Sequence, residues 1–140
     1  TFRDYYLETK FVQENHSFST AHVLSGLHFQ EGQAKLIYVV KGVILDVAVD
    51  IRKNSPTYKE SYGIELDAKN HQLFFIPDGF AHGFYVLSQE AHLIYKVSSY
   101  YDPKKEKGIL WNDPDLKIDW PVKEPVFSQK DQNNPLLKDL

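Results

Sequence analysis

Short apolar runs separated by turn-forming residues fill the chain between about residues 11 and 99. The runs are rich in β-branched and aromatic residues, and glycine, proline, asparagine and serine stand between them. The clearest predicted strands are KLIYVVKG (35–42), VILDVAVDIR (43–52), SYGIEL (61–66), QLFFIP (72–77), GFYVLS (83–88) and AHLIYKVSSYY (91–101). Many short strands at even spacing predict an all-β sandwich, jelly roll or barrel.

The run at 43–52 departs from simple alternation. Ile44, Val47 and Val49 cannot all point to one side of a regular strand. The run is therefore either buried on both faces or interrupted by a β-bulge.

The two ends of the chain read differently from its middle. Residues 1–10 predict a short helix, and residues 101–140 are polar and proline-spaced, which predicts an extended strap on the barrel that ends in a short helical turn. No linker or internal repeat is visible, so we expect residues 1–140 to form a single domain, as the length also suggests.

Composition excludes several classes of function. The formal net charge is −3, and Asp102 and Glu106 interrupt the one local basic cluster, so no nucleic acid is expected as a partner. The absence of cysteine removes disulfides and thiolate chemistry. No apolar run is long enough to span a membrane and no signal peptide is visible, so we expect a cytoplasmic protein with no membrane partner.

The segment PDGFAH places a histidine at a predicted strand start. A strand ends at Pro77, Gly79 allows a tight turn, and His82 begins the next strand, which would point its imidazole inward from the barrel mouth. The P-x-G-x-x-H spacing resembles the second motif of the cupins, a superfamily of small β-barrels. The alternative is a histidine that is hydrogen-bonded within a turn.

The stretch HFQEGQAK tests whether the barrel binds a metal. Metal-binding cupins usually carry an H-x-H pair and a carboxylate here, but His28 is followed by Gln30, and Glu31 lies in a predicted turn. Two histidines and an amide make a poor divalent site, so we expect no metal. A metal cupin stays as an alternative that metal analysis of the purified protein would decide.

Two further residues have open roles. Lys35 begins an apolar strand and is either a rim lysine with a buried stem or an ammonium inside the barrel that faces an anion. Tyr95 lies in the middle of a strand and is either a core tyrosine or a functional one.

An ordered series of motifs resembles one family closely. The series is FVQENHS, GLHFQ, KLIYVVKG, DVAVDIRKNSPTY, IPDGFAHGFYVLS, IYKVSSYY, GILWNDPDLKIDWP and SQKD. It covers essentially residues 11–137 and resembles the dTDP-4-dehydrorhamnose 3,5-epimerase family. The resemblance implies a cupin-like jelly-roll barrel without metal or other cofactor, usually a homodimer, that acts on a nucleotide-linked 4-keto-6-deoxyhexose in the dTDP-L-rhamnose pathway.

The resemblance also assigns catalytic roles. Epimerisation beside a ketone needs a base on one face, an acid on the other and a cation or donor at the enolate oxygen. By resemblance His28 is the base, Asp131 orients it, Lys35 stabilises the enolate, His82 helps to hold the sugar or its oxyanion, and Tyr95 is the acid.

The remaining assignments concern the nucleotide. By resemblance Tyr101 contacts substrate near the active site, and Gln13 and Asn15 bind the nucleotide portion. The family motif usually reads R-G-L-H, with an arginine that helps to bind the diphosphate, whereas this chain has Ser25 there. The family also has a further N-terminal segment, and the chain starts after it.

Two rival functions follow from Ser25. One is a related enzyme with altered specificity, either a single-carbon epimerase or an enzyme for another nucleotide sugar. The other is a barrel that binds a nucleotide sugar without turnover.

Overall fold

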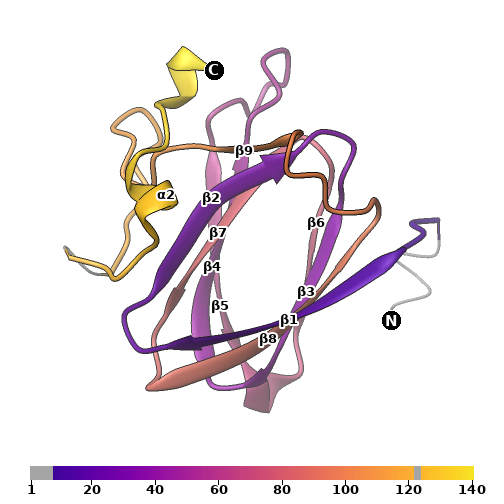
Figure 1. The fold of residues 1–140 in the computed structure, drawn as a ribbon, viewed down its shortest axis with the longest axis vertical. Coiled ribbons are helices and arrows are strands. Elements are labelled where there is room, and N and C mark those ends of the chain that lie inside the picture. Colours follow the sequence, from indigo (N-terminus) through magenta and orange to yellow (C-terminus); the bar gives the residue numbers. More distant parts are fainter. Residues whose placement is uncertain (1–7, 122–123) are drawn as a thin grey trace.

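Two antiparallel β-sheets face each other in the computed structural model, which describes residues 8–121 and 124–140 (Figure 1). The helix predicted over residues 1–10 falls almost wholly outside the described residues. The strands are β1 (Gln13–Thr20), β2 (Leu24–Gln30), β3 (Lys35–Lys41), β4 (Val43–Asp50), β5 (Ser61–Asp67), β6 (Leu73–Ile76), β7 (Phe80–Val86), β8 (Glu90–Val97) and β9 (Glu106–Gly108).

The strand order gives one sheet of four strands and one of five. The four-stranded sheet runs β1-β8-β3-β6, and the five-stranded sheet runs β5-β4-β7-β2-β9. All the pairings between these strands are antiparallel. The predicted fold class is confirmed: the chain is all-β, a jelly-roll of two facing sheets of the cupin kind.

The strand β4 is buried on both faces and carries no bulge. It pairs in regular register with β5 on one side and with β7 on the other. Ile44 and Ala48 belong to the core between the sheets, whereas Val47 and Val49 belong to a second cluster on the outer face. The first of the two alternatives for this run is therefore the correct one.

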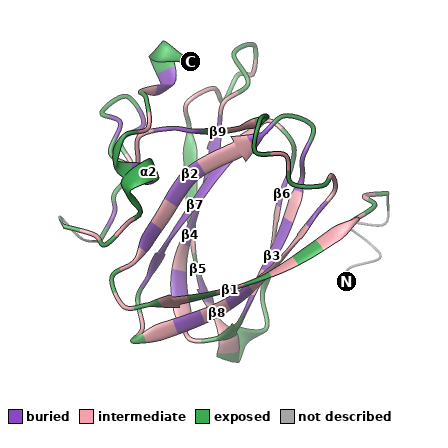
Figure 2. Ribbon diagram, in the orientation of Figure 1, coloured by how far each residue is buried: buried purple, intermediate pink, exposed green. Residues whose placement is uncertain are grey.

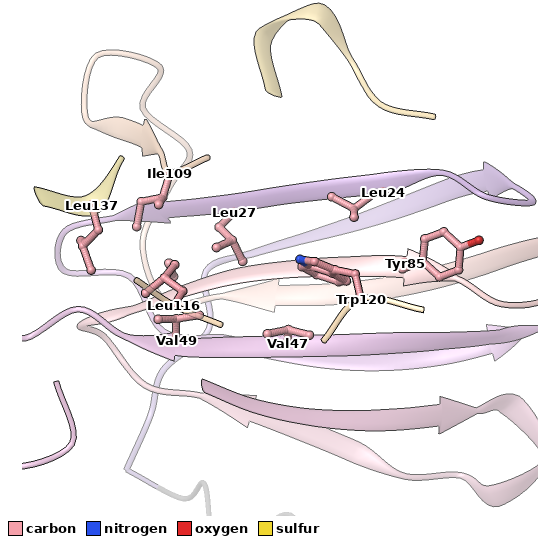
Figure 3. Close-up of a cluster of buried hydrophobic side chains, with 10 residues drawn as sticks. Leu24, Leu27, Val47, Val49, Tyr85, Ile109, Leu116, Trp120 and Leu137 are labelled. Atoms are coloured by element: carbon pink, nitrogen blue, oxygen red, sulfur yellow. The ribbon is translucent and has the colours of Figure 1, made fainter. Parts of the chain in front are cut away.

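The C-terminal strap (residues 101–140) covers that outer face. Figure 3 shows Ile109, Leu116, Trp120 and Leu137 of the strap gathered with apolar side chains of β2, β4 and β7. The strap contains the short helix α2 (Gln129–Gln132) and ends in the 3₁₀ turn η2 (Leu137–Asp139), as predicted, but its strand β9 was not expected. Burial of both faces explains why β4 reads as a nearly continuous apolar run.

The largest differences from the predicted strand boundaries are in β7 and β8. β7 begins at Phe80, so His82 is the third residue of the strand and does not start it, because Phe80 and Ala81 already pair with β4. β8 ends at Val97 rather than at residue 101. Gly79 does adopt a positive φ of 93°, in the turn predicted for it.

The strand β1 differs from the other strands in how little of it is buried (Figure 2). β1 is an edge strand in which half-buried and exposed residues alternate, and none is fully buried. Its inward residues Gln13, Asn15 and Ser17 are polar and line a cavity instead of the core.

The turn after β4 is held by one buried carboxylate. Asp50 is 1% exposed and accepts hydrogen bonds from Arg52 N and Nε (both 3.0 Å), Arg52 Nη2 (2.9 Å) and Ser55 Oγ (2.6 Å). The hydrogen bonds from Arg52 are the main cause that holds the pKa of Asp50 far below its usual range. The Arg52 guanidinium also stacks on Phe80 at 4.9 Å, which ties this turn to the start of β7.

Replacement of Asp50 by asparagine is expected to lower the free energy of unfolding by about 1.5–3 kcal/mol at pH 7, because hydrogen bonds to a charged group are lost. A lowered pKa stabilises the fold fully above the unfolded value of about 3.9 and loses that effect as pH falls through the folded value. Urea unfolding at pH 7 and at pH 3 therefore gives a larger difference between the two proteins at pH 7. Asp119→Asn, at an exposed position, is the control.

Candidate active site

The inward-facing positions change from apolar to polar along the strands. Ile37, Phe84 and Leu93 belong to the core between the sheets, while Lys35, His82 and Tyr95 on the same three strands line a cavity whose floor is formed by Phe84 and Leu93. The cavity has a volume of about 290 Å³. Core side chains thus fill one end of the interior, and the other end is left for a ligand.

Every sequence-predicted site residue reaches this cavity or touches a residue that lines it. Asp131 does so from behind His28. The predicted residues that line the cavity directly are Gln13, Asn15, His28, Lys35, His82, Tyr95 and Tyr101, and Ser25, at the position of the family's arginine, lines it as well.

His28 and Asp131 form a close pair. The His28 Nε2 atom lies 2.5 Å from Asp131 Oδ1, and Asp131 is only 4% exposed. Asp131 lies in α2, three residues after Ser128. The Ser128 hydroxyl caps this helix by accepting a hydrogen bond from the Asp131 N–H. Burial alone would raise the pKa of Asp131, but the hydrogen bond and charge of His28 lower it below its usual range. Asp131 is therefore ionised, and the His28 nitrogen that faces it, Nε2, carries the proton of this hydrogen bond.

A second histidine–carboxylate pair lies on the same wall. His82 Nε2 is 2.7 Å from Oδ1 of Asp46, a fully buried residue of β4. The two atoms are within ion-pair distance but are not aligned as a hydrogen bond. Sequence reasoning missed Asp46, although a single carboxylate in the apolar run VILDVAV is a signal that could have identified it.

Lys35 and Tyr95 come from the facing wall. They lie on β3 and β8 of the four-stranded sheet, opposite the two histidines on β2 and β7 of the five-stranded sheet. Burial lowers the pKa of Lys35, although the charges of Glu106 and Asp46 partly oppose this. Burial, with the charge of Glu106, raises the pKa of Tyr95. The inside position of Lys35 decides against the rim alternative, and Tyr95 stays protonated at neutral pH.

Glu106 is another cavity residue that sequence reasoning missed. It lies 3.3 Å from Lys130 Nζ, and burial would raise its pKa, but a hydrogen bond from Tyr101 and the charge of His28 lower it overall. The same contact with Glu106 raises the pKa of Tyr101. Glu106 stands in the lysine-rich turn DPKKEKG, where nothing in the sequence marks it as a site residue.

The predicted nucleotide-binding residues are linked to each other. Gln13 donates to Asn15 Oδ1 at 2.9 Å and accepts from the Tyr101 N–H at 3.1 Å. Ser17 lines the cavity two residues further along β1, where the alternation of that strand could have predicted it. The other cavity residues not predicted are Gln33, Phe84, Leu93 and Val97.

Gln30, which stands where metal-binding cupins carry their second histidine, has a structural role. Gln30 donates to the Tyr100 carbonyl at 2.9 Å and accepts from the Asp102 N–H at 3.0 Å. Within residues 8–121 and 124–140, no group of three or more histidine, cysteine or acidic side chains could hold a metal ion. No helix in the same residues is long and apolar enough to cross a membrane.

Comparison with known proteins points to one family. The family model described as dTDP-4-dehydrorhamnose 3,5-epimerase matches residues 1–139. The enzyme of that name from Shigella flexneri is 49% identical over 135 residues, which cover 94% of this chain and 75% of that protein. Its counterpart from Methanothermobacter thermautotrophicus is 50% identical over 137 residues, which cover 94% and 74%.

A solved structure shows the same fold. The dTDP-6-deoxy-D-glucose-3,5-epimerase of Legionella pneumophila, in complex with dTDP-4-keto-L-rhamnose, superimposes with a TM-score of 0.93 at 46% identity. The match covers 98% of this chain and 75% of that one. With the family model, the close relatives and the fold in agreement, the chain belongs to the dTDP-4-dehydrorhamnose 3,5-epimerase family.

Proposed function

We propose that the protein epimerises a dTDP-linked 4-keto-6-deoxyhexose at C3 and C5, through an enolate and without a cofactor. The observation that carries the proposal is the placement of two proton-transfer groups on opposite walls of one cavity. His28 stands on the five-stranded sheet and Tyr95 on the four-stranded sheet. A carbon between the walls can lose its proton to one side and regain one from the other.

In the first half of the reaction His28 acts as the base. Its Nδ1 takes the proton beside the C4 ketone, the C–H electrons form the enolate double bond, and negative charge moves to the C4 oxygen. Lys35 and His82 stabilise that oxygen, each from its own wall of the cavity. Asp131, fixed at 2.5 Å, stabilises the imidazolium that forms.

In the second half Tyr95 acts as the acid. Its hydroxyl gives a proton to the opposite face of the same carbon, which inverts the centre and restores the ketone. The raised pKa of Tyr95 keeps that proton on the oxygen until the enolate is present. Proton exchange with water then resets both residues.

The decisive experiment follows deuterium. Wild-type protein incubated in heavy water with dTDP-4-keto-6-deoxyglucose is expected to place deuterium at C3 and C5, as read by NMR of the recovered sugar. A well-folded protein that binds dTDP but introduces no deuterium would instead be a nucleotide-sugar-binding barrel.

Ser25 motivates a prediction about the nucleotide. Lys35 is the one lysine or arginine among the described residues that line the cavity, and Ser25 can offer a diphosphate only a neutral hydrogen bond. Ser25→Arg is expected to tighten dTDP binding about ten- to a hundred-fold, because a charge-assisted contact contributes about 1.5–3 kcal/mol. Titration calorimetry measures the change. The same affinity for Ser25→Arg and for the neutral control Ser25→Gln would show that no phosphate reaches this position.

The proposal includes a cytoplasmic homodimer. The outer face of the four-stranded sheet carries three exposed apolar side chains, Phe18 (55%), Val40 (48%) and Leu73 (42%), on β1, β3 and β6. Exposed apolar side chains on one face of a sheet favour burial against a second copy of the chain. Sedimentation equilibrium is expected to give twice the mass of the chain, and Val40→Asp is expected to shift the protein towards the monomer.

A further inference from the structure

The strand β2 contains one extra residue opposite β7. Leu24 pairs with Tyr85 and Ser25 with Phe84, but the next pair is His28 with His82. Gly26 and Leu27 therefore both lie opposite a single residue of β7, Gly83. This is the arrangement of a β-bulge.

The bulge changes which way His28 points. Side chains alternate along a regular strand, so residues 25 and 28, three positions apart, would face opposite sides of the sheet. Here Ser25 and His28 both line the cavity, while Leu24 and Leu27 both pack in the outer cluster. The extra residue thus turns His28 from the strap side of the sheet into the cavity.

Gly83 provides the room that the bulge occupies. A Cβ on Gly83 would lie 2.8 Å from the Ser25 carbonyl oxygen and 3.0 Å from Leu27 Cδ2. The first distance is shorter than real Cβ contacts allow, and the atom it meets is backbone. Gly83 has no positive φ, so its backbone would accept alanine without strain, and the contact with the bulge is what excludes a side chain.

The bulge also reaches the carboxylate that orients His28. The Gly26 N–H donates to Asp131 Oδ2 at 3.3 Å, while Asp131 Oδ1 contacts His28. Gly26 itself has a φ of 122°, and a Cβ there would lie 2.6 Å from Gly83 Cα. Displacement of the bulge would therefore disturb both members of the pair.

We infer that Gly83 is a positioning residue for the catalytic base: its missing side chain admits the β2 bulge that aims His28 into the cavity against Asp131. The inference rests on the proposed function for its kinetic consequence. Gly83 touches no reacting atom and acts only through His28.

The test compares two alanine variants in strands of the same sheet. Gly83→Ala is expected to lower kcat about a hundred-fold, the size of effect that a misplacement of about 1 Å produces. Its affinity for dTDP should stay within about threefold, because the predicted nucleotide-binding residues Gln13 and Asn15 lie on β1, in the other sheet. Gly63→Ala is the control, since the nearest atom to a Cβ there is Leu45 Cδ1 at an ordinary 3.6 Å, and it is expected to change neither quantity.

Two further measurements distinguish a specific change in the orientation of His28 from a general loss of structure. The proton between His28 and Asp131 should give a low-field NMR resonance that shifts or disappears in Gly83→Ala and persists in Gly63→Ala. In a His28→Ala background, Gly83→Ala should cause no further loss of the residual exchange rate, because the residue through which it acts is gone.

Each outcome decides the inference. A Gly83→Ala variant with kcat within about threefold of wild type, or one that unfolds or no longer binds dTDP, would overturn it, the latter by showing a general packing role. If wild-type protein exchanges no deuterium, the proposed function fails, but the NMR comparison still shows whether Gly83 positions His28.

Discussion

His28→Ala is expected to abolish measurable epimerisation, with kcat and the rate of deuterium entry both falling by about 10²–10⁴-fold. The imidazole is the group that removes the proton, and alanine leaves Asp131 without its partner. A water molecule in place of the imidazole would not hold a base in the same geometry. The fold should persist, because His28 lies at the cavity and not in either apolar cluster. Circular dichroism, dTDP calorimetry and solvent deuterium exchange check the three statements.

The matched control for this variant is His71→Asn. His71 is exposed and has a φ of 52°, a conformation that asparagine tolerates well. Its replacement is expected to leave the exchange rate unchanged. Retention of the wild-type exchange rate by His28→Ala would assign the base to another residue, and His82, which faces the same cavity, would be the next to replace.

Tyr95→Phe is expected to stop inversion by a similar factor of about 10²–10⁴ while deuterium still enters the substrate. His28 can remove a proton and return a deuteron to the same face, so exchange needs only one wall of the cavity. Inversion needs a proton from the opposite wall, and phenylalanine has none to give. NMR of the recovered sugar separates deuterium content from configuration at C3 and C5.

The control is Tyr62→Phe, on the exposed edge strand β5, where the side chain is 60% exposed. It is expected to invert the sugar at the wild-type rate. Inversion by Tyr95→Phe at that same rate would mean that water or another side chain supplies the second proton. Loss of both exchange and inversion would show that Tyr95 also helps to form the enolate.

The two walls of the cavity carry different kinds of side chain. The five-stranded sheet carries both histidines, and each ring contacts a buried carboxylate, Asp131 or Asp46. The four-stranded sheet carries Lys35 and Tyr95, whose pKa values are shifted mainly by burial. The first wall thus presents rings that are held by carboxylates, and the second presents a buried ammonium and a partly buried hydroxyl.

The sequence by itself determined the all-β class and the positions of most strands, because alternation and turn residues are local properties. For residues 43–52 the sequence left two alternatives, burial on both faces or a bulge. The outer cluster under the strap, which contains Val47 and Val49, decided for burial on both faces. The motif series carried the assignments of His28, Lys35, Tyr95 and Asp131, since an ordered set of short motifs is specific where each one alone is not.

Only the tertiary structure decided which of these residues share a cavity and from which wall each approaches. The pairing of His28 with Asp131 joins residues 103 positions apart, and Asp46 and Glu106 enter the site through sheet pairing that local patterns do not encode. The direction of His28 depends on one bulge opposite Gly83, and a one-residue shift in register reverses every later side chain. Long-range pairing and register are properties of the assembled sheets, and they therefore appear only in the folded protein.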